Sequence, residues 1–160
     1  MDSKLPTEIV KKVKKCVDKL MKDDKPLLER DAHEVSITHI LGCYLQQKFN
    51  YDWNVDCEYN RYGNDGKKRN NGRPYRPDII VHKRDEKKIE GNLLMIQVKK
   101  DNALSTKIKN AKNDLKDFTS KNNEPQYQWG LLLIVPVGAS SNDKSPNYTW
   151  FTNGEEIIVE

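Results

Sequence analysis

Long apolar runs and paired cysteines are both missing from this sequence of 160 residues. No stretch of eighteen or more apolar residues occurs, so no transmembrane helix is predicted. The N-terminal residues lack the apolar segment of a secretory signal. The three cysteines, Cys16, Cys43 and Cys57, are odd in number and widely spaced, which favours reduced thiols over disulfides. We therefore expect a cytoplasmic protein with no membrane partner.

Several common catalytic signatures are absent as well. The sequence has no glycine-rich phosphate loop, and neither Ser36 nor Ser105 lies in an elbow motif of the kind that exposes a hydrolase nucleophile. His39 and Cys43 are spaced i, i+4 on an expected helix, and together with Cys57 they suggest a zinc site. No C-x-x-C pair supports that alternative.

Positive charge, in contrast, is concentrated in one segment. The net charge of the chain is +4, yet residues 61–76 alone carry six basic residues against one acidic residue, a net charge of +5. The basic residues are Arg61, Lys67, Lys68, Arg69, Arg73 and Arg76. A solvated loop explains such a run, and so does a polyanion partner. Tyr62 and Tyr75 in the same segment suit either base stacking or anchoring of the loop.

The order of apolar patterns predicts an α/β fold in a single domain, 1–160. We expect two helices, then three strands, a helix and two strands, which form a mixed central sheet with helices on both faces. The expected helices are 7–22, 27–48 and 104–121, and the expected strands are 54–59, 78–82, 93–99, 129–137 and 148–151, with a short edge piece at 155–160. In this scheme 1–24 is an appended N-terminal helix, 27–137 the core and 61–77 a long basic loop.

Polar side chains interrupt two of the apolar strands. Asp78 lies in the run 76–81, and Gln97 and Lys99 lie in the run 93–99, where strand alternation places both on one face. On a helical wheel, Glu34 falls at the edge of the apolar stripe of the second helix. If the two strands pair, these groups can hold a divalent cation and position a water against a phosphate.

Each of these residues also has a plainer interpretation. Asp78 suits a turn after Pro77, Gln97 and Lys99 suit the solvent face of an edge strand, and Glu34 suits an exposed surface. Two further residues are open or assigned locally: His82 has no defined role, and Asp101 is expected in the N-cap region of the helix 104–121.

Taken together, the helix acid, Pro77-Asp78 and Gln97-Val98-Lys99 resemble the motif of the PD-(D/E)xK nuclease superfamily, which has the restriction-endonuclease-like fold. The superfamily core has the order of helix, three meandering strands, helix and strand. Most members carry an acid where this chain has Gln97, and the Q-x-K variant is similar to the Mrr-like branch of restriction nucleases.

The resemblance implies a metal-dependent endonuclease that hydrolyses DNA phosphodiester bonds. Asp78, Gln97, Lys99 and Glu34 would be its catalytic residues. Mg²⁺, or Mn²⁺ as a substitute, would be held by Asp78, Gln97, the main-chain oxygen of Val98 and Glu34. Lys99 would orient or deprotonate the attacking water, or stabilise charge on the phosphate.

The basic loop would contact DNA, duplex or branched, and a homodimer would cut both strands. Two alternatives stay open, and the replacement of an acid by Gln97 favours the first of them. The first is a nucleic-acid-binding module of the same fold without catalysis. The second is an α/β interaction domain whose basic loop binds an acidic protein.

Overall fold

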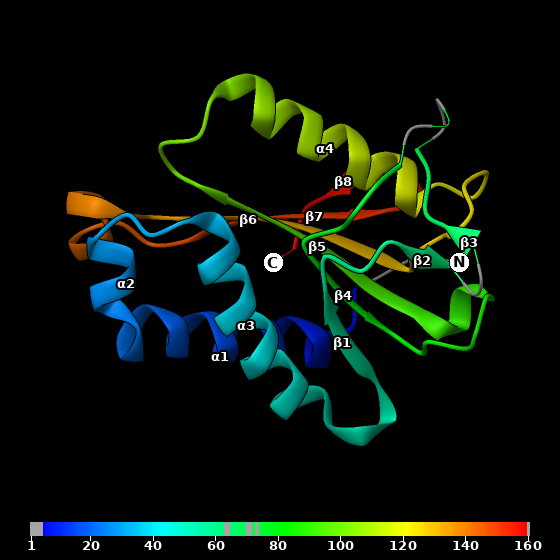
Figure 1. Cartoon of the computed structure of the whole chain (residues 1–160), viewed down its shortest axis with the longest axis horizontal. Coiled ribbons are helices and arrows are strands. Elements are labelled where there is room, and N and C mark those ends of the chain that lie inside the picture. Colours follow the sequence, from blue (N-terminus) through cyan, green and yellow to red (C-terminus); the bar gives the residue numbers. More distant parts are fainter. Residues whose placement is uncertain (1–4, 63–64, 70–71, 73, 160) are drawn as a thin grey trace.

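The centre of the molecule is a six-stranded mixed sheet with the order β1-β4-β5-β6-β7-β8 (Figure 1). The computed structural model describes residues 5–62, 65–69, 72 and 74–159. In the sheet β5 and β6 are parallel, and the other neighbours are antiparallel. Its strands are β1 (Asn54–Cys57), β4 (Ile79–His82), β5 (Asn92–Lys100), β6 (Trp129–Val135), β7 (Asn147–Thr152) and β8 (Glu155–Ile157). The predicted α/β class with a mixed sheet is confirmed.

Helices cover both faces of this sheet, as predicted. Figure 1 shows α1, α2 and α3 on one side and α4 on the other. The helices are α1 (Thr7–Asp23), α2 (Lys25–Glu29), α3 (Glu34–Phe49) and α4 (Ser105–Thr119), with short 3₁₀ turns at η1 (Asn50–Asp52), η2 (Ile89–Gly91) and η3 (Gly138–Asn142). In β6, Leu131 and Leu133 pack into the core under α1 and α3, whereas Leu132 packs into the core under α4. This alternation explains why the strand is apolar on both faces.

The second predicted helix, 27–48, is wrong as a continuous element. The chain forms the short helix α2, leaves helical geometry at residues 30–33, and begins α3 at Glu34. Asp31 has a positive φ of 51°, and the backbone N–H of Ala32 donates to the carbonyl of Leu27 at 3.2 Å, which ends α2. Glu34 is therefore the first residue of α3. This N-terminal end of the helix lies beside the C-terminal end of β5.

Strand pairing brings the second and third motif segments together. In the antiparallel pair of β4 and β5, Ile79 is opposite Ile96. Asp78, which directly precedes β4, therefore lies beside Gln97 and Val98 of β5. The hairpin predicted from the two apolar runs is confirmed, and it places Asp78 beside the C-terminal part of β5.

The described residues of the basic segment 61–77 form more regular structure than the predicted loop. The segment contains the short antiparallel strands β2 (Arg61–Tyr62) and β3 (Asp65–Gly66), and a bridge joins Lys68 to Pro74.

None of the helices in the described part of the chain has the length and apolar character that a membrane span requires.

The role expected for Asp101 is also wrong. Residue 104 precedes α4, and no side chain caps that helix. Asp101 instead accepts hydrogen bonds from the backbone N–H of Val137, at 3.1 Å, and from the hydroxyl of Ser140. It thereby fixes the loop that follows β6, since two donors of that loop meet one carboxylate.

Candidate active site

The ammonium group of Lys99 lies among three oxygens at the end of β5. Its Nζ is 2.8 Å from Oε1 of Glu34, 2.9 Å from the main-chain oxygen of Val98 and 3.6 Å from Oδ2 of Asp78. The structure thus brings together Asp78, Lys99 and Glu34, as the motif predicts. The oxygens converge on a positive charge, and in this structure the positive charge is the lysine's own.

Asp78 is held by the strand beside it. Its Oδ2 accepts a hydrogen bond of 2.8 Å from the backbone N–H of Val98, and its side chain is 18% exposed. Burial raises the pKa of Asp78 to about 6, although the Lys99 charge and the Val98 hydrogen bond both act to lower it. The Glu34 charge raises it further. Asp78 is therefore ionised at neutral pH and becomes protonated in mildly acidic solution.

Lys99 remains protonated at neutral pH. Burial by itself lowers the pKa of a lysine, but the charges of Asp78 and Glu34 and their hydrogen bonds outweigh burial and raise the pKa of Lys99 above its usual value. A lysine in this state has no free electron pair to accept a proton from water. The arrangement favours electrostatic stabilisation of charge on a bound anion over general-base catalysis.

The amide of Gln97 contacts the basic segment. Gln97 is buried, and its Nε2 donates a hydrogen bond to the hydroxyl of Tyr75. Tyr75 is itself buried, stacked on Phe118 of α4 with ring centroids 4.6 Å apart. Of the two roles considered for Tyr75, the structure shows the anchoring one. Its partnership with Gln97 was not predicted, because a loop tyrosine has no periodicity that would assign it a partner.

The donor chemistry of the cluster fits a hard divalent cation, but its present arrangement does not enclose one. The donors are oxygens, from Asp78, Glu34 and the Val98 carbonyl, which is the ligand type of Mg²⁺. Among the described residues, no three acidic, histidine or cysteine side chains are grouped closely enough to hold a metal ion. Lys99 contacts the same oxygens that a cation would use, so the two compete for them.

Among the described basic residues of this segment, some are exposed and others bind partners within the protein. Arg61, Lys68 and Arg76 are exposed, and Arg73 lies outside the described residues. Arg69 forms a two-pronged ion pair with Asp114 of α4, at 2.8 and 3.1 Å.

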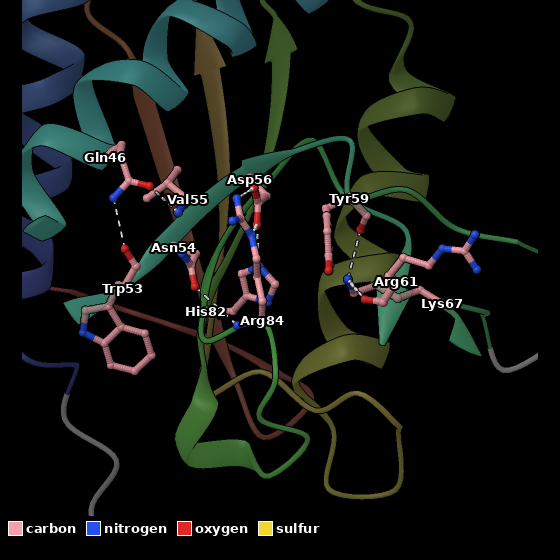
Figure 2. Close-up of polar contacts among 10 residues, drawn as sticks. All are labelled: Gln46, Trp53, Asn54, Val55, Asp56, Tyr59, Arg61, Lys67, His82 and Arg84. Carbon is pink, nitrogen blue, oxygen red and sulfur yellow. Dashed lines mark hydrogen bonds and ion pairs between the residues drawn. The ribbon is translucent and has the colours of Figure 1, made fainter. Parts of the chain in front are cut away.

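Lys67 does not reach the surface, which corrects the prediction that it contacts nucleic acid. It is 2% exposed, and its Nζ donates to the carbonyls of Tyr59 and Arg61 and lies 4.6 Å from the Tyr59 ring centre (Figure 2). Burial lowers the pKa of Lys67 to about 7. Lys67 therefore anchors the base of the basic segment.

A second polar cluster, which the sequence did not reveal, joins β1 to β4. Asp56 accepts a 2.8 Å hydrogen bond from Nε2 of His82 and a two-pronged ion pair from Arg84 (Figure 2). Burial raises the pKa of Asp56, but the hydrogen bonds of His82 and Arg84 lower it more and hold it below its usual range. His82, whose role was open, therefore ties the edge strand β1 to its neighbour. Among the described residues, no serine or cysteine forms a hydrogen bond with Asp56 or His82.

A cavity of about 920 Å³ lies between α3 and β1 and is lined by the three residues of the zinc alternative. The Sγ of Cys43 and Nε2 of His39 are 4.0 Å apart. Cys57 donates to the carbonyl of Thr38, and burial raises its pKa to about 11, so it is a neutral thiol. Since zinc binds thiolate, these contacts give the zinc alternative no support.

Comparisons of the chain with protein-family models, curated proteins and solved structures find no match. The resemblance to the PD-(D/E)xK superfamily therefore depends on the motif residues and on the order of strands in this chain.

Proposed function

We propose that the protein is a metal-dependent endonuclease that hydrolyses DNA phosphodiester bonds in a restriction-endonuclease-like domain. The observation that supports this most is the meeting of Asp78, Glu34 and Lys99 at the end of β5, with Nζ of Lys99 2.8 and 3.6 Å from the two carboxylates. Three residues from separate segments converge where a phosphate can approach a cationic group. A partly buried cluster in which the pKa of an acid is raised, as it is for Asp78, is typical of a functional site.

Asp78, Glu34, the Val98 carbonyl and the Gln97 side-chain oxygen would hold Mg²⁺ or Mn²⁺. When bound, such an ion supplies Lewis acidity toward a phosphate oxygen and makes a coordinated water more acidic. With Gln97 in place of an acid, the carboxylates supply a charge of about −2 rather than −3. We therefore expect weak Mg²⁺ binding, which Mn²⁺ can compensate.

The residues of the chain perform the remaining steps. The protonated Lys99 stabilises negative charge as it builds on the phosphate, because its ammonium is already directed into the site by two acids. Asp78 acts in its ionised form, which is present above about pH 6. The exposed Arg61, Lys68 and Arg76 of the basic segment bind the phosphates of DNA.

Plasmid nicking in Mg²⁺ or Mn²⁺ tests the proposal. The comparison is wild type, Asp78→Asn, Lys99→Met and the matched control Lys100→Met, since Lys100 is the neighbouring lysine and pairs with Asp31 instead. We expect wild type and the control to nick the plasmid and the two site variants to lose at least a hundredfold in rate. Equal nicking by all four proteins, or no cleavage of either the plasmid or a bulged duplex by pure wild type with either metal, would refute it. If two copies act together, linear DNA appears alongside nicked circles.

The second candidate is a non-catalytic DNA-binding module of the same fold. The contact that favours it is the hydrogen bond from Lys99 to the Val98 carbonyl, because the lysine then occupies an oxygen that a cation would need as a ligand. This module binds DNA with a steep salt dependence and leaves the plasmid intact in both metals. An interaction domain for an acidic protein would show neither property.

A further inference from the structure

A pocket of about 260 Å³ opens beside the site, between the basic segment and α4. Its walls include Arg69, Arg76, Gln97, Lys99, Lys107 and Asn110. Gln97 and Lys99 thus belong both to the candidate active site and to this pocket. Whatever occupies the pocket lies directly next to the group that is proposed to act on a phosphate.

Two flat groups, Tyr75 and Arg69, line one wall of the pocket, and Phe118 supports them from behind. The Phe118 ring stacks on the Tyr75 ring with an interplanar angle of 21°, and the guanidinium of Arg69 lies 4.5 Å from the centre of the Tyr75 ring. Asp114 holds that guanidinium by two hydrogen bonds, so its orientation is fixed. The Arg69 side chain is 35% exposed and lines the pocket. The stack therefore ends in a rigid planar cation with an accessible surface.

The remaining walls carry two kinds of recognition group. Arg76, Lys107 and Lys99 supply positive charge, and the side chains of Arg76 and Lys107 are exposed. Gln97 and Asn110 supply amides, which hydrogen-bond the polar edges of nucleobases. A planar ring with a polar edge, attached to a phosphate, matches all three features. The volume of about 260 Å³ suits one nucleotide and is too small for a base pair.

We propose that this pocket binds one unstacked nucleotide of DNA, with its base on the guanidinium of Arg69 and its phosphate toward Lys99 and Lys107. The inference extends the proposed function, because it assumes that DNA is the partner. It defines the substrate class as DNA with a single-stranded or extrahelical nucleotide beside the cleaved bond, such as a bulge, flap or end. Guanidinium planes and aromatic rings are the usual stacking platforms for such bases.

Binding is measured in EDTA by fluorescence anisotropy, so that no cleavage occurs. Three DNAs of equal length are compared: a single strand, a fully paired duplex, and a duplex with one extrahelical 2-aminopurine. We expect wild type to bind the first and third about tenfold more tightly than the paired duplex. We also expect it to shield the 2-aminopurine from acrylamide quenching.

The test variant is Arg69→Lys, which keeps the charge and the ion-pairing partner but removes the plane. It should lose the preference for unstacked DNA while the slope of log Kd against log salt stays the same. The control is Arg61→Gln, an exposed residue of the same segment that does not line the pocket. It should weaken all three DNAs alike and reduce the salt slope by about one. Should Arg69→Lys fail to fold, Asn110→Leu on the exposed surface of α4 serves instead.

Two outcomes overturn the pocket proposal: no preference of wild type for unstacked DNA, or equal weakening of all three DNAs by Arg69→Lys. Cleavage in Mg²⁺ or Mn²⁺ is scored separately. A protein that prefers the bulge but never cuts refutes the endonuclease and supports the pocket. A protein that cuts paired DNA without any preference refutes the pocket alone.

Discussion

The Nζ of Lys99 lies 2.8 Å from Oε1 of Glu34, across 65 positions of sequence. This ion pair joins the end of β5 to the first residue of α3, so it fixes the helix layer to the sheet at the candidate site. The same ammonium donates to the carbonyl of Val98 at 2.9 Å. Lys99 therefore contacts the oxygens that we propose as ligands of a cation.

Replacing Lys99 with methionine should strengthen metal binding while it abolishes cleavage. Without the ammonium, Glu34 and the Val98 carbonyl have no competing cation, so Mn²⁺ should bind several-fold more tightly, as measured by isothermal titration calorimetry. Cleavage should fall by about a hundredfold or more, because the charge that stabilises the phosphate is lost. Lys100→Met should change neither property. Weaker Mn²⁺ binding in Lys99→Met would show that these oxygens do not form a cation site.

Asp78→Asn should stabilise the fold at neutral pH although it removes activity. The pKa of Asp78 is raised in the folded protein to about 6, above its value in the unfolded chain. Protonation therefore favours the folded state, and the stability associated with Asp78 is lost as pH rises through 6. Urea unfolding at pH 8 should show Asp78→Asn to be more stable than wild type by up to about 3 kcal/mol, with the gap closing near pH 4. A variant less stable than wild type at pH 8 contradicts this prediction.

Gln97→Glu should lower the metal concentration at which activity is half-maximal. The substitution adds one negative charge to the donors, and the Tyr75 hydroxyl, which now accepts from the amide, can donate to the new carboxylate. Titration of nicking and of direct Mn²⁺ binding measures the change, and Tyr75→Phe in both backgrounds shows how far the tyrosine contributes. Equal midpoints for wild type and Gln97→Glu would count against Gln97 as a ligand.

The neighbours Lys67 and Lys68 should differ in their effect on DNA binding. Lys67 is buried and bonded to carbonyls, whereas Lys68 is exposed. Lys68→Met should therefore reduce the slope of log Kd against log salt by about one, and Lys67→Met should leave it unchanged. A loss of slope in Lys67→Met equal to that in Lys68→Met would mean that the Lys67 ammonium reaches DNA.

The same pair of lysines shows what sequence could not predict. A charged run indicates a solvated face, but the acceptors of the Lys67 ammonium are main-chain carbonyls of an irregular segment. Because every residue has such a carbonyl, the amino-acid sequence does not indicate which of them bind a lysine. Tyr75 and the Arg69–Asp114 pair were missed for the same reason, because Tyr75 and Arg69 lie in an irregular segment while their partners lie in β5 and α4, without shared periodicity. The break before Glu34 was missed because it depends on the positive φ of Asp31.

In contrast, the meeting of Asp78 with Lys99 was predictable. Polar residues inside apolar strands are costly unless they have partners, and strand alternation determines which of them share a face. The pairing of the two strands then follows from two apolar runs joined by a polar connection, and the structure adds the register in which Ile79 is opposite Ile96. The mixed sheet followed from the order of strands around the predicted helix 104–121.

A crystal soaked in Mn²⁺ tests the central claim most directly, through the anomalous signal of the metal. We expect a peak within about 2.5 Å of a carboxylate oxygen of Asp78, with the Lys99 ammonium moved off the Val98 carbonyl. A crystal with no peak at Asp78, and with Lys99 still bonded to Glu34 and Val98, would contradict the account.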